Sequence, residues 1–545
     1  MFMKKNDVFS MTAERLGADL EGVCRHEGMA VFVPGILPGE TADVRIVKTA
    51  DRYAFGRRIS DPAVPSHDRR EPDCDVFPRC GGCTCRHIQY EATLEAKRQQ
   101  VKDCFLRIAK LDIPVEPVLG MDHPFAYRNK TALPVGGTAD HPVLGFYAPR
   151  SHDIIPADHC PNAMEPSTEI SKAFLSWMRS HRIEPYHEET HKGLVRHLVI
   201  RVNRKKESMV TVVINGTRLP GTEDLIRDLV PLGVTGINLN ENRDRTNVIF
   251  GKNFTNIYGK DTLKDRLCGL DFELAAPAFF QVNPEQTEKL YGTALAFAKL
   301  KETDTLCDVY CGAGTISLMM ARHCRHVTGI EIVPEAIENA KENARRNGIS
   351  NADFHTGKAE DLLPEMVADG LRPDVIVVDP PRKGLEPSVI DAIAEAGPDR
   401  VVYVSCNVAT QARDAALLTA KGYTLLKAQP VDMFCWTSGT ENVILLSKLS
   451  SAKHIDVHLD MTELDVTNAE NSYGEATYEQ IKQYVKEHHN MNVSSLYIAQ
   501  VKRKVGIIER ECYNKPKSEY THVPQCPPEK EKAIIDAFEH FGMIS

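Results

Sequence analysis

The chain has 545 residues, of which 42% are hydrophobic, and a formal net charge of −9. This length predicts about two to four domains. The negative charge excludes a chain-wide basic attraction to nucleic acid, so that only a local basic surface would bind one. The opening residues MFMKKNDVFS hold no apolar segment behind the lysines, and no apolar run approaches the roughly 18 residues of a membrane span. We therefore expect a cytoplasmic protein with no secretory signal and no membrane partner.

Residues 7 to 60 predict a small antiparallel β-barrel, because apolar and polar residues alternate between the turns HEG and LPGE. Basic and aromatic side chains are interleaved in the second half of this segment: Arg45, Lys48, Arg52, Tyr53, Phe55, Arg57 and Arg58. Such a set suits a surface that follows an RNA backbone and stacks on its bases. A solvated barrel face is the alternative. We place this domain at residues 1–62.

Fifteen cysteines are an odd and high count for a reducing compartment, which disfavours scattered disulfides. Cys74, Cys80 and Cys83 follow a C-x5-C-x2-C pattern, and Cys160 is the best candidate for a fourth thiolate. Cys85 competes with Cys83 as a ligand, but the two-residue spacing after Cys80 favours Cys83. Three clustered thiols and a remote one fit either zinc or an iron–sulfur cluster.

This cysteine cluster belongs to a predicted central α+β domain at residues 63–272. A proline-rich, charged stretch opens the domain, and a helical stretch follows at 90–111. Strands and helices then mix without a motif of their own. The segment therefore predicts an α+β fold, and it suggests no functional residues apart from its cysteines.

Residues 273–450 alternate helices with strands at 305–309, 326–330, 374–378 and 401–405. Strands that alternate with helices at this spacing predict a Rossmann-like, parallel, doubly wound sheet. The tail, residues 451–545, forms a separate α-rich extension with two predicted helices joined by a turn. Both a helix-turn-helix that contacts nucleic acid and a small packing module remain open for it.

A glycine-bearing turn follows the first of these strands. The strand ends at Asp308, the turn Cys311-Gly312-Ala313-Gly314 comes next, and the second strand ends in Glu331. Glycines let the backbone approach a ligand, and a carboxylate at the next strand tip accepts both hydroxyls of a ribose. The turn lacks the third glycine of the dinucleotide motif G-x-G-x-x-G, which favours S-adenosylmethionine over NAD.

The strand at 374–378 ends in a rigid turn, Asp379-Pro380-Pro381. The two prolines fix φ and remove backbone donors, so Asp379 is aimed at the cleft beyond the sheet. In amino-group methyltransferases, an aromatic residue follows a similar turn and stacks on the base. Arg382 follows here, which argues against an adenine or guanine amino group as the target.

The last predicted strand delivers a thiol, Cys406, and a carboxylate, Glu441, lies 35 residues further on. Carbon-5 of a uracil is a poor nucleophile until a thiolate adds to carbon-6. A general base must afterwards remove the carbon-5 proton so that the thiol can leave. One cysteine and one carboxylate near a methyl donor therefore fit uracil C5-methylation. A small buried hydrophobe is the alternative role of Cys406.

Five ordered motifs, FFQVNPEQTEKL, DVYCGAGTISL, VVDPPRKG, VSCNVAT and TENVILL, resemble the RNA (uracil-5-)-methyltransferase family. The similarity spans roughly residues 7 to 450, and the nearest branch is the one that methylates 23S ribosomal RNA. It implies that the barrel is a TRAM domain and that the 273–450 domain has the class I methyltransferase fold. One departure is Gly439, where the family often has a histidine two residues before the base.

The resemblance also implies roles for single residues. Cys406 would be the nucleophile and Glu441 the general base. The residues that match the S-adenosylmethionine site are Gln281, Tyr310, Glu331 and Asp379. Those that match the ligands of a [4Fe–4S] cluster are Cys74, Cys80, Cys83 and Cys160. We expect a monomer that acts on an unpaired or flipped uridine, in ribosomal RNA rather than transfer RNA.

Two other functions remain to be tested against this hypothesis. An amino-group methyltransferase would keep its activity after the change Cys406→Ala. An RNA-binding assembly factor with a vestigial methyltransferase fold would bind RNA without forming a product.

Overall fold

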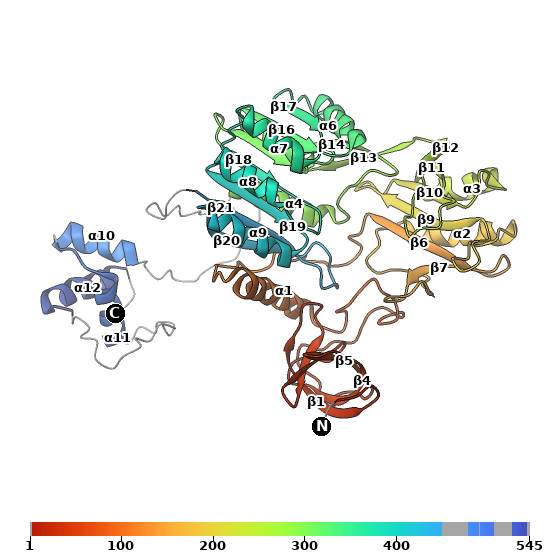
Figure 1. The fold of residues 1–545 in the computed structure, drawn as a ribbon. Helices are drawn as coiled ribbons and strands as arrows, with labels where there is room; N and C mark the ends of the chain where they lie inside the picture. Colours follow the sequence, from red (N-terminus) through yellow and green to blue (C-terminus); the bar gives the residue numbers. More distant parts are fainter. Residues whose placement is uncertain (1–2, 449–477, 490, 506–525, 542–545) are drawn as a thin grey trace. The chain divides into compact units, whose positions relative to one another are not determined.

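The structure is a computed structural model that describes residues 3–448, 478–489, 491–505 and 526–541. Its internal contacts divide the chain into two compact units, Met1–Asp456 and Val457–Ser545. The first unit contains a barrel and two large sheets, and helices are the regular elements described in the second (Figure 1). The finer boundaries within the first unit, at residues 62, 272 and 450, remain predictions.

The chain begins with a closed barrel in the strand order β1-β2-β3-β5-β4. Its strands are β1 (Val8–Leu16), β2 (Gly22–His26), β3 (Met29–Val33), β4 (Thr41–Thr49) and β5 (Tyr53–Arg58). The predicted barrel is confirmed, except that β3 pairs with β5 in parallel, which closes the sheet. Gly56 is needed at this closure, because a Cβ there would lie 2.3 Å from Cγ1 of Val44 in the barrel core.

A buried ion pair joins the barrel to the cysteine segment, residues 63–89. Nε of Arg69 donates to the fully buried carboxylate of Glu40 over 2.6 Å. The segment leads into helix α1 (Tyr90–Cys104), which continues as the π-helix η1 (Phe105–Ala109). The predicted helix is thus confirmed, and its apolar residues pack among those of the doubly wound sheet described below.

The central sheet has the strand order β12-β11-β10-β9-β6-β7-β8. Its strands are β6 (Lys130–Gly137), β7 (Pro142–Tyr147), β8 (Ile154–Pro156), β9 (Val195–Val202), β10 (Ser208–Ile214), β11 (Val234–Glu241) and β12 (Asn253–Gly259). Helices α2 (Ser167–Ser180) and α3 (Thr222–Leu229) and the short 3-10 helix η2 (Val230–Leu232) contribute to its apolar core. A hairpin of β13 (Thr262–Leu267) and β14 (Leu270–Ala275) leads out of it.

The third sheet has the order β17-β16-β15-β18-β19-β21-β20, in which the first five strands are parallel and β21 runs antiparallel to its neighbours. Its strands are β15 (Thr305–Val309), β16 (His326–Glu331), β17 (Ala352–Thr356), β18 (Val375–Val378), β19 (Arg400–Ser405), β20 (Thr424–Val431) and β21 (Glu441–Ser447). The four strands expected from the sequence are confirmed. Strand β17, with mostly exposed side chains, was not predicted, and neither were β20 and β21, whose antiparallel pairing departs from the expected parallel sheet.

Helices cover both faces of this sheet, as a doubly wound fold requires (Figure 1). One apolar core forms against α4 (Pro284–Ala298), α5 (Thr315–Ala321) and α6 (Pro334–Arg346). The other forms against α1, η1, α7 (Ala359–Ala368), α8 (Pro387–Ala396) and α9 (Val408–Ala420). The sheet edge where its parallel strands end is left for a ligand.

The second unit contains three helices among its described residues: α10 (Tyr478–His489), α11 (Ser495–Lys504) and α12 (Pro528–His540). They share an apolar core that includes Ile481, Ile498 and Phe538. The two predicted helices are confirmed, whereas α12 was not predicted, and residues 451–477 of the expected extension lie outside the described ones. No helix in the described ranges has the length and apolar character needed to cross a membrane.

Candidate active site and cysteine cavity

The expected cofactor residues lie at the carboxyl edge of the doubly wound sheet. Val309 of β15 pairs with Ile330 of β16 and with Val378 of β18. The positions at or just beyond these pairs are Tyr310, Glu331 and Asp379. Because the strands are parallel, the three residues come to one edge of the sheet, as their positions at strand ends predict.

The glycine turn after β15 is held against Glu331. The backbone N–H of Gly312 donates to Oε2 of Glu331 over 3.2 Å, and that of Val333 donates to Oε1 over 2.9 Å. Gly314 has φ +80°, which glycine adopts without strain, and Tyr310 has φ +73°. The backbone therefore turns tightly next to a carboxylate, which is the arrangement that a ribose and its neighbouring groups need.

Two carboxylates lie behind this turn, the fully buried Asp308 and the half-buried Asp379. Burial raises the pKa of Asp308 to about 6, and its carboxylate accepts a hydrogen bond from the Ser317 hydroxyl. Burial, together with the negative charge of Asp308, raises the pKa of Asp379 to about 7. The edge thus concentrates acidic groups in a region that excludes water, where a positively charged ligand would be favoured.

Cys406 directly follows β19, and Glu441 is the first residue of the adjacent antiparallel strand β21. Ser405 of β19 pairs with Asn442 of β21, so the next position in the register sets Cys406 opposite Glu441. Burial raises the pKa of Glu441 to about 8, with Asp379 adding to the shift and Arg382 opposing it. Burial also raises the pKa of the Cys406 thiol, as do Glu441 and Asp379, while Arg382 lowers it. The Cys406 thiol, the Glu441 carboxyl group and the Asp-Pro-Pro turn therefore interact within one site.

Asn407, which the sequence interpretation did not single out, fixes the turn that carries the thiol. Its Oδ1 accepts from the backbone N–H of Ala409 over 3.2 Å and caps helix α9. Its Nδ2 donates to the carbonyl of Arg382 over 3.0 Å. An asparagine just before a helix is a recognisable N-cap signal, but its bond to the Asp-Pro-Pro turn is visible only in the fold.

Gln281 lies on the segment that enters helix α4. Nδ2 of Asn129, next to β6, donates to the Gln281 carbonyl over 3.0 Å. Asn283 caps α4, and its Nδ2 donates to the carbonyl of Met433 over 3.1 Å. The backbone of Gln281 is therefore fixed between the central sheet and the loop that precedes Glu441.

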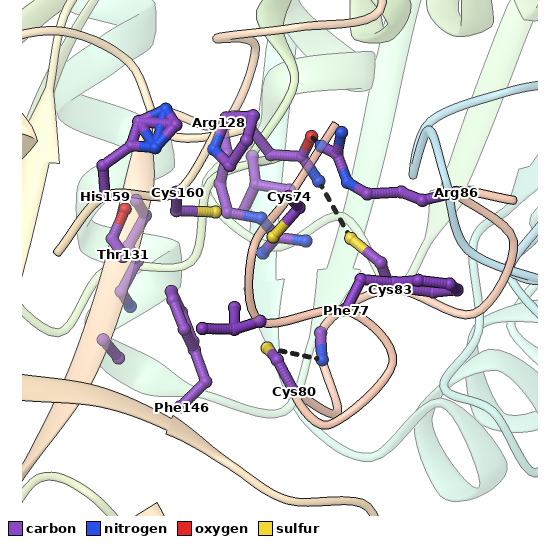
Figure 2. A pocket seen from close by; sticks show the side chains of 17 residues that line it. Cys74, Phe77, Cys80, Cys83, Arg86, Arg128, Thr131, Phe146, His159 and Cys160 are labelled. Carbon is purple, nitrogen blue, oxygen red and sulfur yellow. Dashed lines mark hydrogen bonds between the residues drawn. The ribbon is translucent and has the colours of Figure 1, made fainter. Parts of the chain in front are cut away.

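The four cysteines of the predicted cluster line one cavity of about 320 Å³. Figure 2 shows Cys74, Cys80 and Cys83 on one side and Cys160 arriving from a separate segment. The backbone N–H of Gly82 donates to Sγ of Cys80 over 3.3 Å, and Nδ2 of Asn162 donates to Sγ of Cys83 over 3.4 Å. Long-range folding thus brings together the thiols that the spacing pattern and the remote candidate suggested.

Cys85 is placed differently from these four. Its side chain is fully buried with Leu20, Leu37 and Ile88, and it does not line the cavity. Of the two candidate ligands, Cys83 faces the cavity and Cys85 does not.

The cavity wall is basic. Arg86, Arg128 and Lys130 line it, and no aspartate or glutamate is among the described residues that do so. Burial and the neighbouring Arg201 lower the pKa of Lys130 to about 8. In the described part of the chain, no group of three or more His, Cys, Asp or Glu is arranged to hold a metal ion. The cavity is thus lined by four thiols and by three cationic side chains.

Comparison with known proteins supports the same family. The family description tRNA (Uracil-5-)-methyltransferase matches residues 234–449, and the TRAM domain matches residues 7–59. An RNA methyltransferase of Clostridium tetani is 42% identical over 83% of this chain and 98% of its own length. One of Halalkalibacterium halodurans is 44% identical over 82% of this chain and 98% of its own length.

A solved structure gives the same result for the fold. The Pyrococcus abyssi tRNA (uracil-54, C5)-methyltransferase in complex with S-adenosyl-L-homocysteine matches with a TM-score of 0.64 and 25% identity. The match covers 80% of this chain and all of that one. The chain therefore belongs to the S-adenosylmethionine-dependent RNA (uracil-5-)-methyltransferase family and carries its TRAM domain at residues 7–59.

Proposed function

We propose that this protein transfers the methyl group of S-adenosylmethionine to carbon-5 of a uridine in RNA, with Cys406 as nucleophile and Glu441 as general base. The observation that carries the proposal is the register of β19 and β21, which sets the thiol opposite a buried carboxylate at the sheet edge. The glycine turn and Glu331 lie at the same edge.

The reaction follows from these positions. The Cys406 thiolate adds to carbon-6, and the electron pair displaced to carbon-5 attacks the methyl group of the sulfonium, releasing S-adenosylhomocysteine. The Glu441 carboxylate then takes the carbon-5 proton, the double bond between carbon-5 and carbon-6 forms again, and the bond to sulfur breaks.

We place the S-adenosylmethionine site of this proposal at the carboxyl ends of the parallel strands. Glu331 would accept the two ribose hydroxyls, and the turn at Gly312 and Gly314 would let the ligand approach the backbone. Tyr310, Asp379 and Gln281 would complete the site. The acidic character of this edge favours the positive sulfonium over the neutral product, which helps release after transfer.

We propose that Cys74, Cys80, Cys83 and Cys160 hold a [4Fe–4S] cluster in the cysteine cavity. Four thiolates around a cluster carry net negative charge, which the basic wall would compensate. N–H groups aimed at sulfur are typical of iron–sulfur sites. When bound, the cluster would cross-link the cysteine segment to the Cys160 segment. Zinc, which four thiolates also bind, is the alternative, and the metal content of the purified protein decides between the two.

We propose ribosomal RNA, specifically 23S RNA, as the substrate, because the chain combines a TRAM barrel with a cysteine cluster. Transfer RNA is the second candidate, favoured by the Pyrococcus abyssi structure. Tyr53, Phe32 and Phe55 of the barrel lie with ring centroids 5.6 to 5.9 Å apart and Tyr53 is 42% exposed, which suits stacking on unpaired bases.

We propose that the chain acts as a monomer, which its mass in solution would test.

Mapping 5-methyluridine in ribosomal and transfer RNA tests this function. We expect one ribosomal site to lose its methyl group in cells that lack the protein and to regain it when the full chain is restored. A chain carrying Cys406→Ala should not restore it. Loss of the methyl group from transfer RNA instead would select the second candidate, and an unchanged map would reject both.

A further inference from the structure

The loop that precedes Glu441 is buried although it forms no helix or strand. This base loop, residues 432–440, joins β20 to β21 and ends directly before Glu441. Asp432, Met433 and Cys435 are fully buried, and Trp436 is 2% exposed. Such a loop needs outside partners for its backbone groups, and several of them come from elements more than 300 residues away in the sequence.

One side chain of α1, Lys97, joins the two ends of the base loop. The Lys97 ammonium forms an ion pair with Asp432 at the first end, and both side chains are fully buried. The same ammonium donates to the carbonyl of Gly439 over 2.8 Å at the other end, two residues before Glu441. Because an ammonium has three donors on a compact head, it can satisfy both acceptors at once.

The partners of Lys97 are themselves fixed. Tyr90, seven residues earlier on α1, donates its hydroxyl to Oδ2 of Asp432 over 2.6 Å. Nε2 of Gln286, from α4, donates to the Asp432 carbonyl over 3.1 Å. The Asp432 carboxylate is therefore held by two side chains of α1 and its backbone carbonyl by α4, which gives Lys97 a fixed position from which to hold Gly439.

The cysteine segment holds the middle of the same loop. The backbone N–H groups of Thr84 and Cys85 donate to the Trp436 carbonyl over 3.0 and 3.2 Å. Nε1 of Trp436 donates to the Pro124 carbonyl over 2.7 Å. The base loop is thus fixed at both ends by Lys97 and in its middle by the residues that follow Cys83.

We propose that Lys97 is a positioning residue for Glu441, which sets the direction of the base carboxylate by closing the base loop. Pairing of Val431 with Glu441 fixes the strand backbone, but the segment entering Glu441 is anchored at the Gly439 carbonyl. The inference rests on the proposed function. It predicts that loss of Lys97 slows removal of the carbon-5 proton and spares the earlier thiol addition and methyl transfer.

The test follows both steps in single turnovers of the full chain on RNA with tritium at carbon-5 of its uridines and a ¹⁴C-methyl donor. We expect Lys97→Met to transfer methyl at nearly the rate of the unaltered chain. Tritium release should fall by about 100-fold, as a small misplacement of a catalytic group can cause, and a methylated protein–RNA adduct should accumulate. Lys102→Met, on the same helix, is the matched control and should keep both rates.

A second variant separates positioning from folding, because Lys97→Met leaves Asp432 buried without its cation. The double change Lys97→Gln and Asp432→Asn replaces the pair by two neutral amides, and the shorter side chain no longer reaches Gly439. An unchanged ratio of tritium release to methyl transfer in this variant would overturn the proposal, as would an equal loss of both steps or an unfolded chain. No adduct and no tritium release by the unaltered chain would reject the proposed function instead.

Discussion

The sheet edge and the cysteine cavity are both built around cysteines, but they have opposite charge. The sheet edge carries Asp308, Glu331, Asp379 and Glu441, of which Asp379 and Glu441 act on the Cys406 thiol. The cavity surrounds four thiols with arginine and lysine side chains. The first environment favours a cation such as a sulfonium, and the second favours an anion such as a thiolate-bound cluster. The residue type alone therefore does not decide the chemistry of a cysteine, whereas its charged neighbours do.

The strongest test of this contrast removes the single thiol of the acidic site. Cys406→Ala should lower methylation by at least about 10³-fold, because carbon-5 is not activated without the sulfur. It should also abolish the denaturation-resistant RNA adduct. Product formation by scintillation counting and adduct formation by gel electrophoresis measure the two effects. Cys526→Ala, a half-buried thiol of the second unit, is the control that should change neither. Residual turnover at the rate of the control would exclude covalent catalysis.

Replacing Glu441, the proposed general base, should block proton removal and leave the earlier steps intact, whereas Cys406→Ala should abolish all of them. Glu441→Gln should lower turnover by about 10²- to 10⁴-fold, the usual contribution of a general base, and should leave thiol addition and methyl transfer intact. The adduct should then accumulate and survive denaturation. Sustained turnover without any adduct would mean that another residue removes the carbon-5 proton.

A matched pair of serine substitutions tests whether the cysteine cavity holds an iron–sulfur cluster. Cys83→Ser should lower the iron and sulfide content of the anaerobically purified protein severalfold, because its thiol faces the cavity. Cys85→Ser should leave the metal content unchanged and lower only the free energy of unfolding, since it places a hydroxyl in an apolar core. Zinc in place of iron, or equal metal loss in both variants, would contradict the proposed ligand set.

The smallest expected effect concerns Arg382, a positive side chain that acts on both Cys406 and Glu441. In the proposed reaction both Cys406 and Glu441 must lose their protons, and burial raises the pKa of both groups, that of Glu441 to about 8, so kcat/KM should rise with pH through a limb that lies at or above pH 8. Arg382 lowers the pKa of both groups. Arg382→Met should therefore move the rising limb to higher pH by about one unit. Lys383→Met, a surface residue paired with Glu360 and Glu386, should leave the profile unchanged, and the same profile in both variants would refute this role of Arg382.

Much of the acidic site was predictable because its residues follow strands. Asp308, Asp379 and Cys406 each end an apolar run, and the carboxyl ends of parallel strands meet at one edge. The contacts of Lys97 with Asp432 were not predictable, because 335 residues separate them and neither lies in a motif. Strand β17 was missed since four of its five side chains are at least partly exposed, which leaves no apolar run to find.

Helix α9 adds a feature of the acidic site that does not titrate. Asn407 caps this helix directly after Cys406, so the thiol lies at the N-terminal end of a helix of 13 residues. Aligned peptide dipoles give such an end about half a positive charge, which stabilises a neighbouring thiolate. This contribution is the same at every pH and requires no titrating side chain. The backbone of α9 therefore stabilises the Cys406 thiolate on its own, and a substitution of Arg382 would not remove this contribution.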